Sequence, residues 1–173
     1  PRSFRSFLRS SRRARRRRLL LTMIAIIALA GVLQARLDLL GRLGDQECQT
    51  VLCCEECPAL RVSRVIDGDT FDSSAGRVRL YGVDTPERNE RCYAAASRRL
   101  SRLARNEVRV EAGPRSRDGN RLLFYVYTRS GESIEERLIQ EGLAQAWTRD
   151  GQHRDILVGL EQSTRLSETG CLW

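Results

Sequence analysis

Short runs of apolar residues, separated by turn-forming residues, follow one another through the C-terminal two-thirds of the chain. Where apolar and polar residues alternate, the pattern indicates a strand with one buried face. Gly-, Asp- and Ser-containing segments between the runs indicate turns. The strands predicted in this way span residues 60–66, 70–71, 77–83, 107–112, 121–128 and 143–147.

Three other segments, 92–105, 133–144 and 154–168, repeat their apolar residues with the period of a helix. In the second of them Gly142 is placed to end the helix. In the first, one face collects the apolar residues Tyr93, Ala96, Leu100, Leu103 and Ala104, and the arginines take the other. The order is therefore three strands, helix, two strands, helix, strand, helix. Pattern alone supports an α+β domain and only hints at a small barrel with helices packed outside.

The N-terminal part of the chain has a different composition. Residues 1–18 carry nine arginines and no acidic residue, and a charge-free apolar run follows over 19–33. Basic and acidic residues nearly cancel in the remaining chain, so the formal net charge of +8 comes from the arm. The high net charge therefore does not by itself indicate a nucleic-acid-binding surface on the folded part.

The basic arm and the apolar run together indicate export. A single-pass anchor with a cytoplasmic arm and a cleaved signal peptide both fit, and a buried or mitochondrial-type segment is a third alternative. We therefore expect a cytoplasmic Arg-rich arm, an anchor or signal segment, a Cys-rich stalk and one folded domain, at residues 1–18, 19–35, 36–58 and 59–173.

Six cysteines favour an oxidising destination. Four of them crowd into the stalk, namely Cys48, Cys53, Cys54 and Cys57. Disulfides are the favoured interpretation of this cluster, and a zinc site or free thiols are the alternatives. The spacing does not assign pairings within it. Cys92 and Cys171 stand apart, and we suggest that they form a disulfide that fastens the C-terminus.

Polar residues interrupt the apolar pattern at the ends of three predicted strands. The clusters are Asp67-Gly68-Asp69-Thr70, then Arg79 with Asp84-Thr85-Pro86-Glu87, then Arg121 after an Asp-Gly-Asn turn. Carboxylates suit Ca²⁺ or Mg²⁺, a third carboxylate is a candidate general base, and arginines bind phosphate. Each cluster alone is more typical of a turn or a solvated surface, so it is their combination that indicates a metal–phosphate site.

The stretches "VIDGDTF", "RVRLYGVDTPE", "DGNRLLFYVY" and "LIQEGLAQAW" resemble the staphylococcal nuclease family in order and spacing, over roughly residues 60–173. The resemblance implies an OB-fold barrel of five strands with three helices, and a Ca²⁺-dependent phosphodiesterase that acts on DNA and RNA. It implies that Asp69, Asp84 and the Thr85 carbonyl are calcium ligands. Asp67 would lie outside the ligand set and orient metal-bound water. It also implies that Glu87 is the base for in-line attack of water and that Arg79 and Arg121 bind the phosphate. The expected products end in 3′-phosphate.

The chain departs from the family's type member near the nucleotide. Asp118 and Gly119 stand where that protein has a Lys-Tyr pair, and Thr148 and Asp150 replace two tyrosines. These departures affect affinity and base preference rather than the hydrolytic step. Trp147, which lies close by, or Tyr81 could supply part of the lost stacking, because stacking tolerates any base.

The leading hypothesis is thus an exported, monomeric, calcium-dependent nuclease with little sequence preference. It would act outside the cytoplasm, tethered to the membrane through residues 19–35 or secreted after cleavage. Its partners would be single- and double-stranded DNA and RNA, and no protein partner is implied. The alternative is a non-catalytic OB-fold module that binds nucleic acid or another partner at the cell surface.

Overall fold

The computed structural model describes residues 48–173 and, before them, residues 23, 26–29, 31 and 34. The predicted arm, most of the predicted anchor or signal segment and the first part of the stalk lie outside the described residues. Among those that are described, no helix has the length and apolar character needed to cross a membrane. Cys48–Trp173 form one compact unit.

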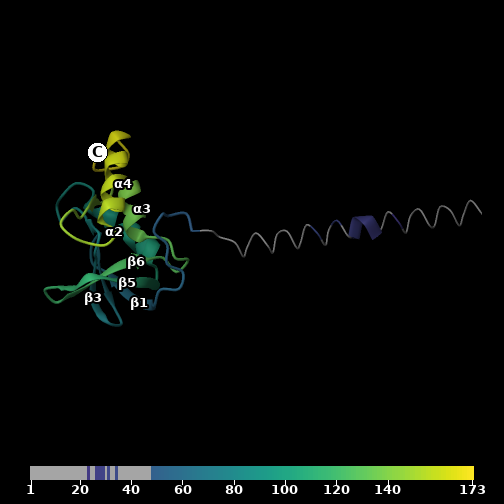
Figure 1. Cartoon of the computed structure of the whole chain (residues 1–173), viewed down its shortest axis with the longest axis horizontal. Coiled ribbons are helices and arrows are strands. Elements are labelled where there is room, and N and C mark those ends of the chain that lie inside the picture. The colour runs from purple at the N-terminus through teal and green to yellow at the C-terminus, as the bar shows by residue number, and fades with distance from the viewer. Residues whose placement is uncertain (1–22, 24–25, 30, 32–33, 35–47) are drawn as a thin grey trace, which may run out of the picture. The chain divides into compact units, whose positions relative to one another are not determined.

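Five strands close into a barrel in the order β1-β2-β3-β6-β5 (Figure 1). Their bounds are Ala59–Val65 for β1, Thr70–Ser73 for β2, Gly76–Leu80 for β3, Glu107–Asp118 for β5 and Arg121–Tyr127 for β6. Neighbouring strands are antiparallel except β3 and β6, which are parallel. A parallel pair needs a long crossover, and here the chain between the two strands includes a helix and β5. The predicted five-stranded barrel is confirmed.

The strand expected over 77–83 is divided in two. After β3 ends at Leu80 the chain bends, and a separate short strand, β4 (Val83–Asp84), pairs with β7 (Gln145–Ala146). Gly82 lies at the bend, where a Cβ atom would come within 2.3 Å of the Leu157 side chain. The backbone is therefore packed too closely for a larger residue, and the bend carries Asp84 out of the barrel.

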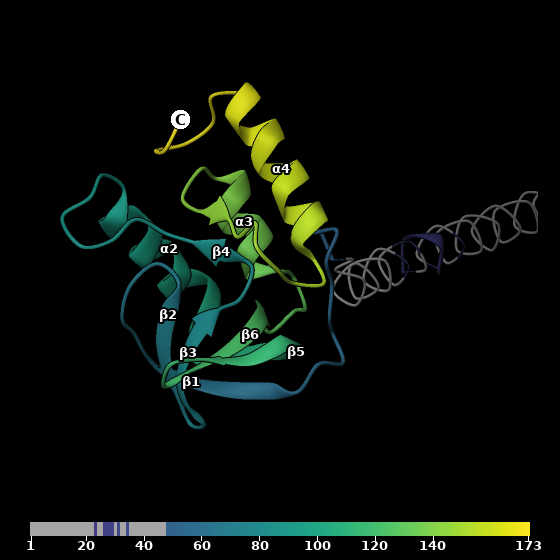
Figure 2. The same cartoon turned by 60° about the vertical axis from the view of Figure 1, so that its left-hand side comes forward.

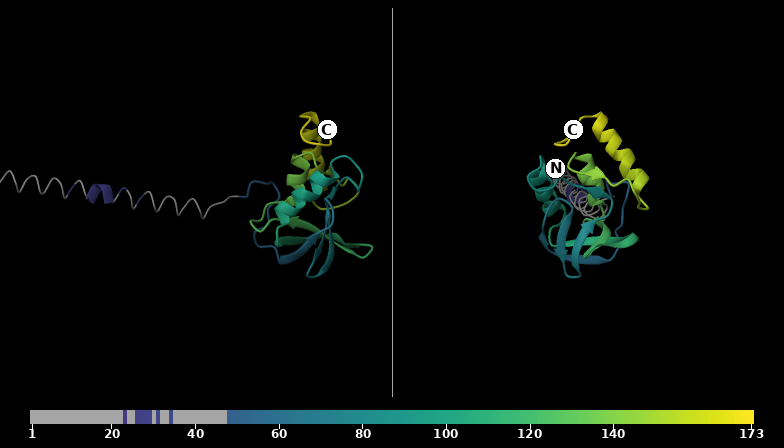
Figure 3. Two further views of the ribbon diagram at one scale, coloured as in Figure 1. Left: turned by 180° about the vertical axis from the view of Figure 1, so that it is seen from behind. Right: turned by 90° about the vertical axis from the view of Figure 1, so that its left-hand side faces the viewer.

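Three helices lie on one side of the barrel (Figures 2 and 3). They are α2 (Tyr93–Ala104), α3 (Ile134–Gln140) and α4 (Arg154–Leu166), close to the predicted segments. Helix α2 contacts β1, α3 contacts β6, and α4 packs against α3. The predicted apolar face of α2 is confirmed, because Ala96, Leu100 and Ala104 are fully buried. Helix α3 ends sooner than expected, and Gly142 follows it with φ +59°, a conformation that favours glycine.

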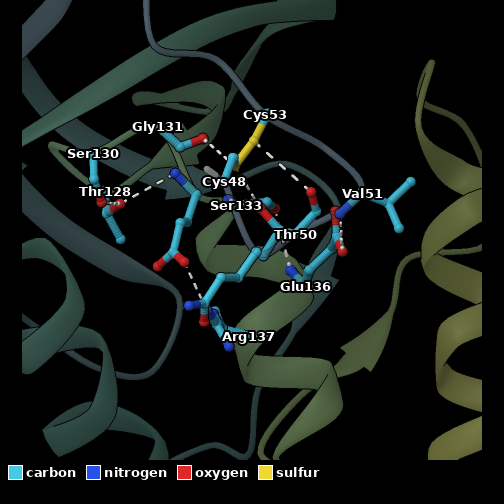
Figure 4. A network of polar contacts seen from close by, with 12 residues as sticks. Cys48, Thr50, Val51, Cys53, Thr128, Ser130, Gly131, Ser133, Glu136 and Arg137 are labelled. Carbon is cyan, nitrogen blue, oxygen red and sulfur yellow. Dashed lines mark hydrogen bonds and ion pairs between the residues drawn. A yellow bond between two sulfur atoms is a disulfide. The ribbon is translucent and has the colours of Figure 1, made fainter. Parts of the chain in front are cut away.

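Residues 48–58, which we call the N-terminal clasp, pack against the start of α3 (Figure 4). The fully buried carboxylate of Glu136 accepts hydrogen bonds from the backbone N–H groups of Val51, at 3.0 Å, and Leu52. The Thr50 hydroxyl oxygen accepts one from the N–H of Ser133 at 3.0 Å. The clasp therefore supplies the donors that a buried carboxylate needs in the absence of water.

Two disulfides close the clasp, Cys48–Cys53 and Cys54–Cys57, so the favoured interpretation of the cysteine cluster holds and the zinc alternative does not. The sequence predicted a stalk up to residue 58, and this prediction is revised for residues 48–58, the part that the structure describes. The compact unit begins at Cys48, and the clasp is joined to α3 by hydrogen bonds. The sequence could not reveal this, since the partner residues lie more than 80 positions away.

Glu135 is a second buried carboxyl of α3 and ties the helix to the barrel. Its Oε1 atom accepts a hydrogen bond from the N–H of Val126 on β6 at 2.9 Å, and its side chain is fully buried. The Ser133 hydroxyl donates to the other oxygen at 3.4 Å. Burial raises the pKa of Glu135 from its ordinary value of 4.5 to about 8.

The free energy of unfolding is therefore expected to fall as the pH rises from about 5 to about 8. In this range the unfolded chain releases the Glu135 proton while the folded state retains it, so proton release favours unfolding. One pKa unit corresponds to about 1.4 kcal/mol, so the loss amounts to several kcal/mol at most. Urea unfolding of the full chain at several pH values measures it.

The variant Glu135→Gln keeps an acceptor for the Val126 N–H and should flatten this pH dependence. Glu56→Gln, at an exposed position of the clasp, is the matched control and should leave the slope unchanged. A slope that is as steep in Glu135→Gln as in the unmodified chain would assign the pH dependence to other groups.

Candidate active site

Arg79 is the centre of the candidate site. It lies on β3, opposite Thr70 of β2 and Leu123 of β6, and its side chain is only 11% exposed. One terminal nitrogen, Nη1, donates to the carbonyls of Leu80 at 3.4 Å and Val83 at 3.2 Å. These carbonyls flank the bend between β3 and β4, so the bend holds the guanidinium in place.

The other terminal nitrogen of Arg79 brings two carboxylates together. Nη2 lies 3.3 Å from Oδ2 of Asp69 and 2.5 Å from Oδ1 of Asp84. Asp69 comes from the turn before β2, whereas Asp84 comes from β4. Carboxylates from two separate sequence motifs therefore converge on one atom of a third side chain.

Asp69 is the buried member of this pair. Its Oδ1 accepts a hydrogen bond from the Thr70 hydroxyl at 2.8 Å, and its Oδ2 accepts one from the Thr85 N–H at 3.2 Å. Asp67 in turn accepts from the N–H of Asp69 at 3.1 Å, which stabilises the turn. Burial raises the pKa of Asp69, and the positive charge of Arg79 opposes this effect.

Gly68 allows the turn, the strand exit and helix α2 to meet. A Cβ atom at this position would lie 2.5 Å from the Thr85 hydroxyl oxygen and 2.8 Å from the Cβ of Ala96. No larger residue fits without moving one of these segments. The glycine of the Asp-Gly-Asp turn thus has a packing role in addition to its role in the turn.

Asp84 is more accessible, with 55% of its side chain exposed. Within the described part of the chain, no group of three or more His, Cys, Asp or Glu side chains is arranged to hold a metal ion. Asp69 and Asp84 are the two carboxylates that the structure brings together here and that could hold a cation. The donor types suit a hard cation such as Ca²⁺.

A cavity of about 360 Å³ lies beside Arg79. Its lining includes Arg121, which lies at the start of β6 and contacts Asp118 across the β5–β6 turn. The residues that line it are Arg79, Tyr81, Arg115, Asp118, Arg121, Leu123, Trp147, Arg149 and Asp150. Four arginines against two aspartates make this cavity attractive to an anion.

Glu87 does not line this cavity. It is exposed, on the segment between β4 and α2, and its N–H donates to the Glu90 side chain at 2.7 Å. The structure thus brings together Asp69, Asp84 and Arg79, and places Arg121 on the same cavity as Arg79, while Glu87 stays outside.

The segment that carries Glu87 is fastened at both ends. Pairing of β4 with β7 holds its start, and the disulfide between Cys92 and Cys171 holds its end at the chain terminus, as the sequence suggested. The terminus is itself bonded to the rest of the domain, since the N–H of Cys171 donates to the Gly142 carbonyl at 3.2 Å. These two attachments limit how far the segment with Glu87 can lie from Asp69 and Asp84.

Three further residues that line the cavity, Arg115, Arg149 and Asp150, were not predicted from the sequence as site residues. Arg115 lies in the last part of β5, beyond the predicted strand end, where the register against β6 shifts. Trp147 directly follows β7, and Arg149 stands two residues after Trp147. Neither Arg115 nor Arg149 belongs to a recognisable motif. The only sequence signal that could have pointed to this part of the cavity was the proximity of Trp147.

A family model described as "Staphylococcal nuclease homologue" matches residues 77–173, more than half of the chain. The chain belongs to the staphylococcal nuclease family. The matched region includes Arg79, Asp84 and Arg121, whereas Asp69 precedes it.

Three relatives within or near this family are described as nucleases. A thermonuclease of Staphylococcus intermedius is 38% identical over 97 residues, which cover 49% of this chain and 57% of that protein. The SPbeta prophage-derived endonuclease YokF of Bacillus subtilis (strain 168) is 32% identical over 103 residues, covering 52% and 34%. Endonuclease YncB of the same organism is 35% identical over 96 residues, covering 48% and 45%. The chain thus spans between one-third and three-fifths of the length of these relatives.

Proposed function

We propose that the chain hydrolyses phosphodiester bonds in DNA and RNA with little sequence preference, in a calcium-dependent reaction. One observation carries the proposal: Arg79 contacts both Asp69 and Asp84 and shares an anion-attracting cavity with Arg121. The descriptions of the three relatives as thermonuclease and endonucleases support the same reaction class.

The two arginines would hold the phosphate. A guanidinium is permanently charged and can bond two phosphate oxygens through its planar fork. Arg79 is already oriented by the carbonyls of Leu80 and Val83, so little reorganisation is needed when negative charge grows on the phosphate. Arg121 would approach the same phosphate once its contact with Asp118 is exchanged for a phosphate oxygen.

Asp69, Asp84 and the carbonyl of Thr85 would hold the calcium ion. The Thr85 N–H bond to Asp69 supports this set, because it fixes the Thr85 backbone beside the buried carboxylate. Arg79 contacts both of these carboxylates through Nη2, so its positive charge lies next to the residues that would hold the cation. When bound, calcium supplies positive charge next to the phosphate and favours attack by water.

Glu87 would accept the proton from the attacking water. In-line attack at phosphorus then forms the bond to the water oxygen and breaks the bond to the 5′-oxygen, which leaves as an alkoxide, takes a proton from solvent and leaves a 3′-phosphate end. The exposed position of Glu87 means that its side chain has to turn inward for this step. General bases in apo structures commonly reach their final geometry only with substrate bound.

The site of action that we propose is extracytoplasmic, with the chain tethered through residues 19–35 or secreted. All six cysteines form disulfides, which is typical of proteins that fold in an oxidising compartment.

The test is degradation of single-stranded DNA and of RNA by the full chain, with calcium and with a calcium chelator. We expect cleavage in calcium, products that end in 3′-phosphate, and loss of cleavage after chelation. Cleavage that survives chelation would contradict the calcium-dependent mechanism. Nucleic-acid binding without cleavage in calcium would instead favour the non-catalytic binding module.

A further inference from the structure

Helix α2 differs from the rest of the domain in its charge. Over residues 48–173 arginines and acidic residues are equal in number, yet residues 91–106 hold five arginines and no acidic residue. Of these five, Arg99 alone forms a salt bridge within the described part of the chain, and its Nε donates to Glu141 at 2.7 Å. The arginines of α3 and α4 are all paired with carboxylates, namely Arg137, Arg154 and Arg165. The positive charge of α2 is therefore concentrated and largely uncompensated.

Three of these arginines, Arg98, Arg102 and Arg105, form what we call the arginine stripe. Arg98 and Arg102 lie about one helical turn apart, and Arg105 follows as the C-cap residue. All three are exposed, whereas Ala96 and Leu100 are fully buried on the opposite side of the helix. At about 1.5 Å per residue the stripe is roughly 10 Å long. It is a row of separate positive charges that faces solvent.

The N-terminal half of α2 lies beside the carboxylates of the candidate site. Ala96 packs against the Asp-Gly-Asp turn, so closely that a Cβ atom on Gly68 would lie 2.8 Å from that of Ala96. Asp69, one of the two converging carboxylates, is the next residue of this turn. The exposed Arg91, just before α2, lines a cavity of about 440 Å³ together with Asp84, the other carboxylate. The arginine stripe thus runs from the neighbourhood of the site towards the C-terminal end of the helix.

The exposed side of α2 suits a ligand with repeated negative charges. A guanidinium bonds phosphate oxygens through its planar fork, and three of them in a row match a row of phosphates. A helix that binds a membrane surface also needs large apolar side chains to insert below the headgroups. Among the described residues, the exposed large apolar side chains all lie outside α2. Charge without apolar anchors favours the sugar–phosphate backbone of a nucleic acid over a lipid surface.

We propose that the arginine stripe is a docking surface for backbone phosphates of a polynucleotide whose scissile bond lies at the candidate site. This rests on the proposed function. Phosphates of one strand of B-DNA advance by about 3.4 Å along the axis, so a stripe of roughly 10 Å spans about three nucleotides. A dinucleotide has a single phosphodiester, which the site itself would hold, and has no phosphate left for the stripe. The docking surface therefore favours long polynucleotides over short fragments and acts on binding rather than on the cleavage step.

Cleavage of a long single-stranded DNA and of a dinucleotide by the full chain in calcium tests the proposal. The double variant Arg98→Ala/Arg102→Ala should raise KM for the long DNA about tenfold with kcat nearly unchanged, because binding and not chemistry is lost. The dependence of log(kcat/KM) on log salt should become shallower by about 1.4, the amount expected when two phosphate contacts on a single strand are removed. Cleavage of the dinucleotide should be unaltered. Both residues are exposed, so the melting temperature should change little.

The matched control is Arg129→Ala/Arg154→Ala, which removes the same charge from exposed positions outside α2. It should change KM for the long DNA by less than about twofold and leave the salt dependence as it is. The variant Arg98→Lys/Arg102→Lys keeps the two charges and should retain most of the salt dependence. Residues 1–18, which are also rich in arginine, are present in every variant, so differences between variants isolate the stripe.

The proposal is overturned if Arg98→Ala/Arg102→Ala behaves like the control, or if it slows the dinucleotide as much as the long DNA, which would indicate a change in the site itself. Vesicles of phosphatidylglycerol and phosphatidylcholine test the lipid alternative. If vesicle binding falls in this variant while the kinetics on DNA stay the same, the stripe belongs to a membrane contact. Absence of cleavage by the unmodified chain would overturn the proposed function as well. Cleavage of long DNA with equal KM in every variant would leave the proposed function standing and refute the docking surface alone.

Discussion

Glu87→Gln is expected to lower kcat by about 10²- to 10⁴-fold, the range over which a general base contributes. Glutamine has nearly the same shape as glutamate but cannot accept the proton of the attacking water. The exposed position of Glu87 means that the change should leave the free energy of unfolding nearly unchanged. The measurement is single-turnover cleavage of single-stranded DNA in saturating calcium, together with thermal unfolding.

Glu90→Gln is the control for this experiment. Glu90 is also exposed, and it accepts a hydrogen bond from the Glu87 N–H, which the glutamine oxygen can still accept. The variant should retain most of the activity. Equal losses in the two variants would point to the conformation of the loop, and an unchanged kcat in Glu87→Gln would remove Glu87 from the mechanism.

Arg79→Lys is expected to lower kcat by about 10²- to 10³-fold, as is typical when one preorganised donor to the transition state is removed. Lysine keeps the positive charge but has one nitrogen in place of a planar fork. That nitrogen cannot bond the carbonyls of Leu80 and Val83 and also reach the two carboxylates. Charge alone would therefore not restore the geometry. The rate of the cleavage step is the quantity to measure.

Arg77→Lys is the matched control, two residues away on the same strand. Arg77 is exposed, pairs with Asp72 and does not line the cavity beside Arg79. Because Arg79 is nearly buried, circular dichroism and a melting curve are needed for both variants. A folded Arg79→Lys protein with the kcat of Arg77→Lys would exclude Arg79 as a contributor to the transition state.

Much of the fold could be predicted from the sequence because the signals are local. In α2 the helical repeat of Ala96, Leu100 and Ala104 identifies the buried face without knowledge of the partner. Strands β1 and β6 lie within about one residue of the predicted ranges. The bend at Gly82 was missed, because its cause is the approach of Leu157 from α4, which the local pattern does not contain.

Only some residues of the candidate site could be predicted, again because the sequence shows local signals and not contacts between distant segments. Asp69, Asp84 and Arg79 stand in short recognisable motifs, and the barrel brings those motifs together. Arg115 and Arg149 stand in no motif, and their position on the cavity depends on how β5 curves and where β7 ends. Glu87 stands in a motif, but its exposed position could not be inferred from it.

The sequence by itself indicated the type of chemistry that we propose, since carboxylates and arginines, the residue types at its strand ends, are suited to calcium and phosphate. It also determined the order of strands and helices, through the spacing of apolar residues. Only the tertiary structure decided that Asp69 and Asp84 share one nitrogen of Arg79, that the clasp belongs to the domain through Glu136, and that Arg149 is left without a carboxylate partner among the described residues. These facts depend on contacts between segments far apart in the chain, and hydrophobic periodicity carries no information about such contacts.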